Sequence, residues 1–239
     1  MSTLLLVRHG QANLHGADYD VLSPLGGKQA TALGAKLAAW GTPIDAVYTG
    51  PLVRHRDTLS HLRAAASRGG LELPEGEVIE GFREMEVAAL VLEAMSRVLP
   101  TCPDLREQLA SGEVGEAGQA AMRHVGGVLG KLLDRWSRGE LPVGGLEPYE
   151  DFAARVRAAL HGVMKREKRG RRILIVTSGG PITVAMRLAL GLDAPRSIEL
   201  LSSIANASLT ELRYTEDTMI LESFNRHSHT LDDGIYSRI

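Results

Sequence analysis

Leu4-Leu5-Leu6-Val7-Arg8-His9-Gly10-Gln11 is the stretch of sequence that decides the fold. Its apolar half is short and ends at charged residues and glycine, a pattern typical of a buried strand. This strand delivers an Arg-His-Gly tripeptide to the edge of a sheet. Because ligands of open α/β sheets bind beyond the carboxyl ends of the strands, we expect Arg8 and His9 to face a binding site.

The tripeptide carries groups that suit chemistry at phosphorus. An imidazole is a competent nucleophile near neutral pH, and a guanidinium binds phosphate oxygens in pairs. Gly10 permits a tight turn and a close approach of the backbone to an anion. The alternative is that His9 is a buried histidine at a strand end, and the tripeptide alone does not decide between the two.

The rest of the chain alternates helices with short apolar strands. Ser23-Pro24 is a typical helix start, and the sequence 173–177 predicts a central strand. We therefore predict an α/β protein, a three-layer α/β/α sandwich around a mostly parallel sheet. Apolar helical patches at about 88–145 predict a helical insertion over the active site, within a single domain that spans 1–239.

Composition narrows the class of protein. The chain has 239 residues, of which 44% are hydrophobic and 23% charged, with a net charge of -2, so a strongly basic nucleic-acid-binding protein is disfavoured. No apolar run is long enough to span a membrane. The single cysteine, Cys102, excludes an intrachain disulfide and is interpreted as a loop thiol. We expect a cytoplasmic enzyme of undetermined oligomeric state.

No metal or other cofactor is expected. His227 and His229 are close in sequence, but a zinc site needs at least three protein ligands and no third is evident.

A second arginine follows a second predicted strand. Arg54 lies on the first turn of a helix, and two arginines at two strand ends can converge on one phosphate. Helix N-termini beside them would add backbone donors. The neighbouring His55, Arg56 and Arg63 are predicted to be surface residues, because a run of charge is usually a solvated helix face.

Several segments resemble, in the right order, motifs of the histidine phosphatase superfamily, which includes cofactor-dependent phosphoglycerate mutases and many phosphatases. The resemblance covers nearly the whole chain except the insertion. Its segments are Arg8-His9-Gly10-Gln11, Leu22-Ser23-Pro24-Leu25-Gly26 with Gln29-Ala30, Pro51-Leu52-Val53-Arg54, Phe82-Arg83-Glu84, the residues Glu147, Tyr149, Phe152, Arg155 and Val156, and then Asn206, Asn225 and His229.

The resemblance implies a role for each matching residue. His9 becomes the transient phosphohistidine, while Arg8 and Arg54 hold the phosphoryl group. Glu84 becomes the general acid for the leaving alkoxide, although Glu80 and Glu86 are close enough to leave the register open. Two further residues are expected at the mouth of the pocket, and they are Gln11 and Asn13.

The chain departs from the superfamily at the end of the central strand. The superfamily carries His-Gly there, whereas this chain has Ser178-Gly179. A serine hydroxyl donates one hydrogen bond to phosphate but supplies no positive charge, and Gly179 keeps the turn and a backbone donor. The loss predicts a rate lower by roughly ten- to a hundredfold. The alternative role of Ser178 is to cap the following helix.

These features favour a phosphatase that hydrolyses phosphomonoesters of small molecules through phosphorylated His9, without a metal. Phosphoglycerate mutase activity is the alternative within the superfamily. A catalytically weakened protein that binds phosphate or phosphopeptides is the alternative from another class, motivated by Ser178. Neither the substrate nor the role of the insertion follows from the sequence.

Overall fold

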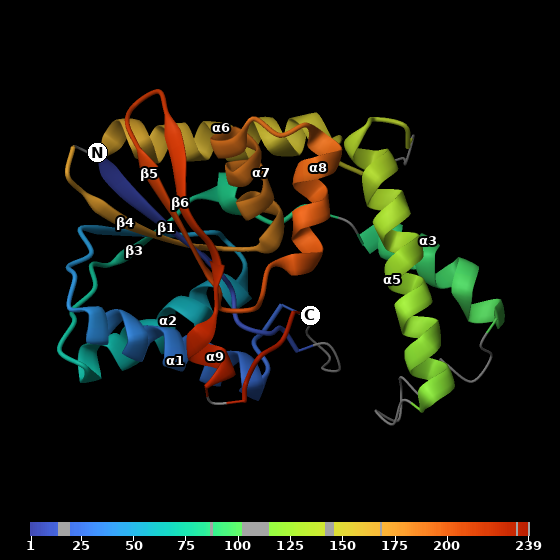
Figure 1. The fold of residues 1–239 in the computed structure, drawn as a ribbon, viewed down its shortest axis with the longest axis horizontal. Coiled ribbons are helices and arrows are strands. Elements are labelled where there is room, and N and C mark those ends of the chain that lie inside the picture. The colour runs from blue at the N-terminus through green and yellow to red at the C-terminus, as the bar shows by residue number, and fades with distance from the viewer. Residues whose placement is uncertain are drawn as a thin grey trace.

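A six-stranded sheet forms the centre of the computed structural model (Figure 1), which describes residues 1–13, 20–86, 88–101, 115–141, 146–167, 169–232 and 234–238. The strand order is β3-β2-β4-β1-β5-β6. Pairing is parallel from β3 through β1, and β5 and β6 are antiparallel. The strands are β1 (Ser2–Arg8), β2 (Ala46–Thr49), β3 (Gly76–Val78), β4 (Arg172–Thr177), β5 (Leu209–Tyr214) and β6 (Met219–Arg226).

Helices cover both faces of the sheet, so the predicted three-layer α/β/α architecture is confirmed. In Figure 1, α1, α2 and α9 lie below the sheet, and α6, α7 and α8 lie above it. The helices are α1 (Pro24–Trp40), α2 (Val53–Arg68), α3 (Ala88–Val98), α5 (Glu116–Ser137), α6 (Tyr149–Arg166), α7 (Gly179–Leu190), α8 (Ala194–Glu199) and α9 (Ser228–Leu231). Short 3-10 helices are η1 (Glu80–Phe82), η2 (Leu99–Thr101) and η3 (Leu200–Ser203).

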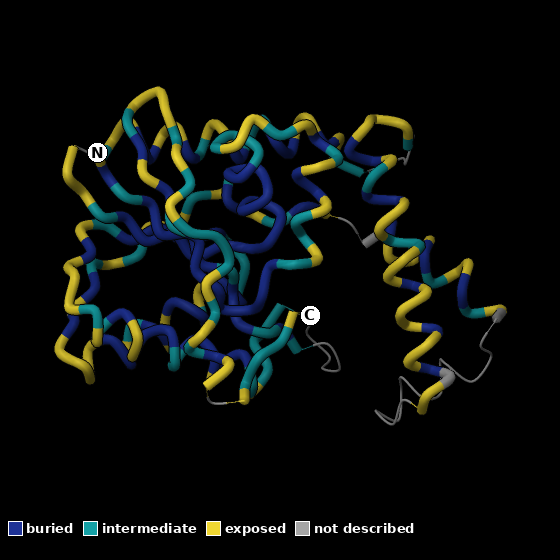
Figure 2. Tube along the Cα trace, viewed as in Figure 1, coloured by how far each residue is buried: buried dark blue, intermediate teal, exposed yellow. Residues whose placement is uncertain are grey.

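The middle of β1, from Leu4 to Val7, is continuously apolar because helices cover both faces of the sheet there. Leu4 and Leu6 belong to the hydrophobic cluster on the side of α6 and α7, whereas Leu5 and Val7 belong to the cluster formed with α1 and α2. All four are buried, and the centre of the sheet is dark blue in Figure 2. The strand is thereby fixed in register, and with it the position of the residues that follow.

The start of α1 explains why two glycines are needed beside the end of β1. Ser23 caps the helix by accepting a hydrogen bond from Gly26 N at 3.0 Å, and Pro24 begins it, as predicted. A Cβ on Gly10 would lie 2.4 Å from Gly26 O, and one on Gly26 would lie 2.2 Å from Gln11 O. Gly10 is thus required by the close approach of α1 to the loop after β1.

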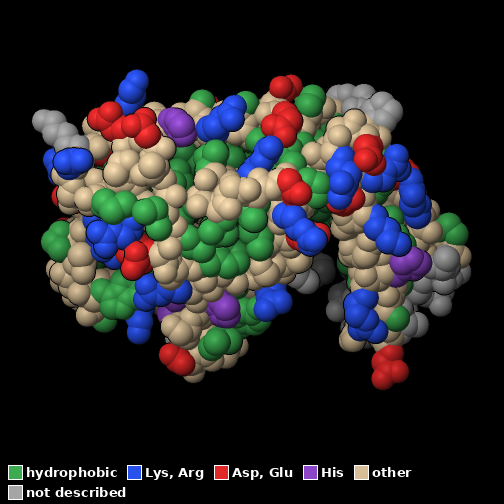
Figure 3. Space-filling view, turned by 45° about the horizontal axis from the view of Figure 1, so that its top comes forward, with side chains coloured by type: hydrophobic (Ala, Val, Ile, Leu, Met, Phe, Trp, Pro, Cys, Tyr) green, Lys and Arg blue, Asp and Glu red, His purple; other side chains and the backbone are tan. Residues whose placement is uncertain are grey.

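The described helices of the insertion, α3 and α5, pack against each other and extend the main core. Val98, Val125 and Trp136 belong to the same hydrophobic cluster as Phe152 of α6. Both helices lie on the side of the sheet toward which β1 runs (Figure 1). Figure 3 shows Arg and Lys side chains along α5. Cys102 lies outside the described residues.

Helix α6 begins at Tyr149, after Pro148 and with Glu150 in its first turn, where the helix dipole favours acidic side chains. No helix in the described part of the chain is long and apolar enough to cross a membrane.

Candidate active site

His9 lies directly after β1, and its backbone is tied to two neighbouring elements. Its N–H donates to Thr177 O of β4 at 2.8 Å, and its carbonyl accepts from Ala207 N at 3.1 Å. His9 Nδ1 lies 2.6 Å from Gly10 O. Because a carbonyl oxygen can only accept, Nδ1 carries the hydrogen, and in a neutral ring Nε2 then presents a lone pair. The backbone thus selects the tautomer that a nucleophile at Nε2 requires.

The surroundings of His9 keep its imidazole neutral. The residue is 6% exposed, and burial lowers the pKa of His9 well below its ordinary value, helped by the positive charges of Arg8 and Arg54. A protonated imidazole has no lone pair to attack phosphorus. Burial and the two guanidinium groups therefore keep His9 neutral, the form that a histidine nucleophile requires.

Arg54 contacts His9 from the first turn of α2. Its Nε donates to His9 Nε2 at 3.2 Å, and its Nη1 pairs with Asp20 Oδ1 at 2.7 Å. The other carboxylate oxygen of Asp20 accepts from Val53 N at 2.8 Å, at the start of the helix. Asp20 therefore fixes both the guanidinium and the helix terminus that carries it.

Arg8 is held by the backbone of the C-terminal segment. Its Nη1 donates to Ile204 O and, at 3.0 Å, to Arg238 O. The segment is itself fastened, since Gln29 Nε2 donates to Ile235 O at 2.7 Å and Ser237 Oγ donates to Asn206 Oδ1 at 2.9 Å. These bonds bring the end of the chain back to the carboxyl end of β1.

Glu84 faces the N-terminus of α7. Its carboxylate accepts from Met85 N at 2.9 Å and from Gly180 N at 3.1 Å. Burial raises the pKa of Glu84, while these hydrogen bonds and the charges of Arg54 and Arg8 lower it. The net direction is upward, so the carboxyl group keeps its proton to a higher pH than an exposed glutamate does.

A third arginine, Arg155 of α6, holds the segment that carries Glu84. It donates to Gly81 O at 3.2 Å, to Arg83 O at 2.7 Å and to Glu84 O at 3.3 Å. Its remaining donors form a two-pronged pair with Glu147, at 2.8 and 2.9 Å. Because Arg155 ties the backbone on both sides of Arg83, it limits where the Glu84 carboxylate can go.

His55 corrects a sequence-based interpretation. It was expected on the surface but is 0% exposed, because α2 turns His55, Thr58 and Leu62 toward the core while Arg56 stays outside. Arg63 is partly buried and donates to Leu73 O at 3.2 Å. Burial, and then the charge of the adjacent arginine, lowers the pKa of His55 to about 3.

Ser178 meets His55 at the junction of β4 and α7. Ser178 Oγ lies 2.6 Å from His55 Nε2, and Ser178 is 0% exposed. Ser178 occupies the N-cap position of α7, but its side chain accepts no capping hydrogen bond. The capping alternative is therefore wrong for the side chain. Gly179 follows, and a Cβ there would lie 3.9 Å from Arg8 Nε.

Gln11 and Asn13, the two residues expected at the mouth of the pocket, have contacts that do not define such a role. Gln11 Oε1 accepts from Ser23 Oγ at 2.9 Å, which directs this side chain to the start of α1. Asn13 N donates to Val21 O at 2.9 Å across the loop. Residues 14–19 of that loop lie outside the described part, so the role of both side chains stays a prediction.

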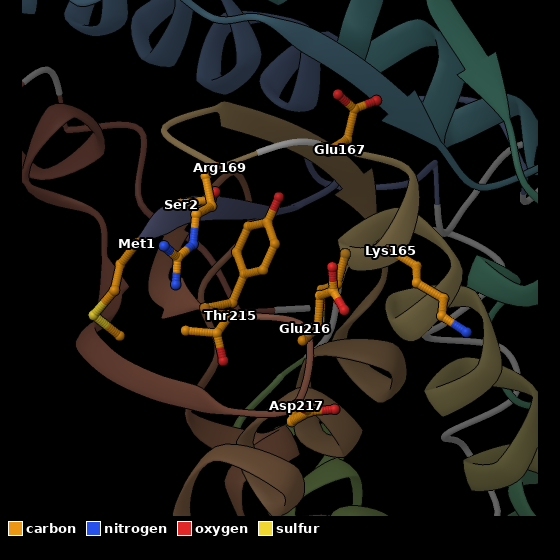
Figure 4. A pocket seen from close by; sticks show the side chains of 10 residues that line it. Met1, Ser2, Lys165, Glu167, Arg169, Thr215, Glu216 and Asp217 are labelled. Atoms are coloured by element: carbon orange, nitrogen blue, oxygen red, sulfur yellow. The ribbon is translucent and has the colours of Figure 1, made fainter.

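A separate cavity lies at the opposite end of the sheet. Figure 4 shows this cavity of about 620 Å³ beside Met1 and Ser2, at the start of β1, with Lys165 and Glu216 among its lining residues. None of the candidate site residues lines it. Among the described residues no three His, Cys, Asp or Glu side chains gather as a metal site.

Together, a neutral imidazole, two guanidinium groups and a protonatable carboxyl group define a site suited to phosphoryl transfer. The chain matches the family model of the histidine phosphatase superfamily (branch 1) over residues 4–120 and 81–227. The protein therefore belongs to the histidine phosphatase superfamily, as the sequence motifs indicated.

Solved structures share this fold over almost their whole length. Bacillus stearothermophilus YhfR is 19% identical with a TM-score of 0.65, covering 96% of this chain and 99% of that one. A phosphoglycerate mutase from Bacillus anthracis str. Sterne is 21% identical with a TM-score of 0.64, covering 98% and 96%. A phosphoserine phosphatase from Entamoeba histolytica, in complex with 3-phosphoglyceric acid, is 18% identical with a TM-score of 0.62, covering 96% and 99%. A search of curated proteins found no match.

Sequence reasoning missed Asp20 and His55. Asp20 sits in a polar loop, where nothing in the local pattern separates a guanidinium partner from a solvated carboxylate. His55 follows Arg54 directly, but whether the next residue on a helix turns inward depends on the phase of the helix. The signal that was available is the serine at position 178, where the resembling motif has an imidazole, together with the imidazole at position 55.

Proposed function

We propose that the protein is a metal-independent phosphomonoesterase that works through a phosphohistidine at His9. The observation that carries the proposal is the hydrogen bond from His9 Nδ1 to Gly10 O, because it leaves the Nε2 lone pair beside the Arg54 guanidinium. Phosphorylated small molecules are the proposed substrates, as the names of the structural neighbours suggest for those proteins.

The first step transfers the phosphoryl group to the enzyme. His9 Nε2 attacks phosphorus, the P–N bond forms, and the bond from phosphorus to the leaving oxygen breaks. Arg54 exchanges its bond with His9 for one to a phosphoryl oxygen, and Arg8 neutralises further charge. Glu84 donates its proton to the leaving oxygen, and the raised pKa of this carboxyl group supports that role.

The second step releases phosphate. Water attacks phosphorus, Glu84, now ionised, takes a proton from that water, and the P–N bond breaks. His9 returns to the neutral form in which it began. The same carboxyl group thus serves both steps in opposite directions.

Two other functions, phosphoryl transfer by a mutase and phosphate binding without catalysis, are the alternatives to hydrolysis. A mutase returns the phosphoryl group to a second hydroxyl of the substrate instead of to water. A binding protein needs no proton donor, and the placement of Glu84 at Gly180 N favours catalysis over that alternative.

The test is hydrolysis of p-nitrophenyl phosphate in the presence of a metal chelator. Wild-type protein should turn over and form a phosphoprotein that survives denaturation in alkali, whereas His9→Ala should lose at least about a thousandfold in kcat. Equal turnover by the two proteins would refute the phosphohistidine. Turnover of a panel of phosphomonoesters would then define the substrate.

A further inference from the structure

A buried serine–histidine pair lies beside the candidate nucleophile. Ser178 and His55 are both 0% exposed, and His55 Nε2 lies 2.6 Å from Ser178 Oγ. The two residues come from different elements, the β4–α7 junction and α2. A buried polar group without a hydrogen-bond partner is costly, and this contact gives a partner to one polar atom of each side chain.

The fold makes room for the His55 ring. A Cβ on Gly50, at the end of β2, would lie 2.3 Å from His55 Nδ1. Such a distance is far below van der Waals contact, so any other residue at position 50 would displace the imidazole. The ring therefore occupies the space that a side chain at position 50 would fill, and its Nε2 contacts Ser178.

The pair lies next to the groups that would bind a phosphoryl oxygen. The centroids of the His55 and His9 rings are 5.7 Å apart, and Arg54 precedes His55 in the chain while contacting His9. On the other side, Ser178 is followed by Gly179, which approaches Arg8. Ser178 thus lies between the His55 ring, which neighbours His9, and Gly179, which neighbours Arg8.

The protonation state decides what this hydroxyl can do. His55 is neutral near pH 7 and carries one N–H. Among the described residues the buried Nδ1 of His55 makes no hydrogen bond, so the hydrogen belongs on Nε2, where it has a partner. There it donates to Ser178 Oγ, and the serine hydrogen is left for another acceptor. Hydrogen bonds in such a chain strengthen one another in a buried site.

We propose that His55 is a positioning residue of the phosphoryl site: it donates from Nε2 to Ser178 Oγ and thereby aims the Ser178 hydroxyl hydrogen at an oxygen of the phosphoryl group bound at His9. This inference rests on the proposed function. The resembling motif has a histidine where this chain has Ser178. In the proposed arrangement Ser178 contacts the substrate instead, and the imidazole of His55 on α2 orients its hydroxyl.

The experiment compares four variants with p-nitrophenyl phosphate as substrate. His55→Phe fills the same space without an N–H, and His55→Gln keeps a donor near the position of Nε2. Ser178→Ala removes the hydroxyl, and the fourth variant combines His55→Phe with Ser178→Ala. Exposed His61 on the same helix supplies the control, His61→Phe, which should keep wild-type kcat.

His55→Phe and Ser178→Ala should each lower kcat by roughly ten- to a hundredfold with less than about a threefold change in KM, because the hydrogen bond strengthens as charge develops on the phosphoryl oxygens. The double variant should lose no more than Ser178→Ala alone, since His55 acts through Ser178. His55→Gln should recover most of the loss.

Wild-type kcat in His55→Phe, losses that multiply in the double variant, or a Gln variant no better than the Phe variant would each overturn the inference. Thermal unfolding is followed for every variant. If His55→Phe does not fold, the affinity of Ser178→Ala for orthovanadate is measured instead. This affinity should be about tenfold or more below that of wild type, and an unchanged affinity would overturn the inference. Retained activity in His9→Ala would refute the proposed function instead, which separates the two failures.

Discussion

Acidification should destabilise the folded protein through His55, because this ring is buried without its proton. The pKa of His55 is about 3 in the folded state against an ordinary value of 6.5. The unfolded chain therefore binds a proton at a pH where the folded chain does not, and stability falls as the pH falls below 6.5. Each pH unit in that window removes about 1.4 kcal/mol, so the step from pH 7 to pH 5 should cost about 2 kcal/mol at this site.

Urea unfolding at both pH values measures this cost when wild type is compared with His55→Gln. Glutamine does not titrate, so its variant should lose about 2 kcal/mol less than wild type on acidification. Contributions from His9 and Glu84 are present in both proteins and cancel in the difference. His61→Gln, an exposed substitution on the same helix, should behave like wild type. Equal losses in wild type and His55→Gln would refute the reasoning.

Other substitutions test the placement of the acid. Gly180→Ala would put a Cβ 2.1 Å from Glu84 Oε1 and should lower kcat by about a hundredfold. Gly162→Ala, where a Cβ meets nothing within 4 Å, should leave kcat unchanged and stabilise the helix by about 0.5–1 kcal/mol in urea unfolding. The lowered pKa of His9 and the raised pKa of Glu84 predict that kcat/KM, measured against pH, has its maximum below pH 7. Glu84→Gln should remove the decline of kcat/KM on the alkaline side of that maximum. It should also slow the hydrolysis of alkyl phosphates more than that of p-nitrophenyl phosphate. Arg155→Met removes the donor to three carbonyl groups and should cost about 1–3 kcal/mol of stability, measured by urea unfolding, together with part of kcat.

The sequence predicts those parts of the fold that local pattern determines. The apolar run of β1 and the Ser23-Pro24 helix start were read correctly, since burial on both faces and helix capping leave clear marks in a few adjacent residues. The order of the strands and the antiparallel β5 and β6 depend on long-range pairing, which such marks do not encode.

For the candidate site, the sequence indicates which residue types are available but not their partners. The predicted strand before Arg54 placed this residue at a strand end, yet its pairing with Asp20 joins residues far apart in the chain. His55 shows the same limit more sharply. Its helix begins at Val53, and that starting point turns the imidazole inward, although the charged residues beside it suggested solvent.

The fastening of the last residues beside Arg8 bears on how the protein is handled in the laboratory. A purification tag fused after position 239 would pull on the stretch whose carbonyl at Arg238 accepts from Arg8. The other terminus, Met1, is 50% exposed and lies at the far end of β1. An amino-terminal tag is therefore the safer choice for kinetic work, because a carboxyl-terminal tag could displace Arg8 and the resulting change in rate would be mistaken for a property of the native protein.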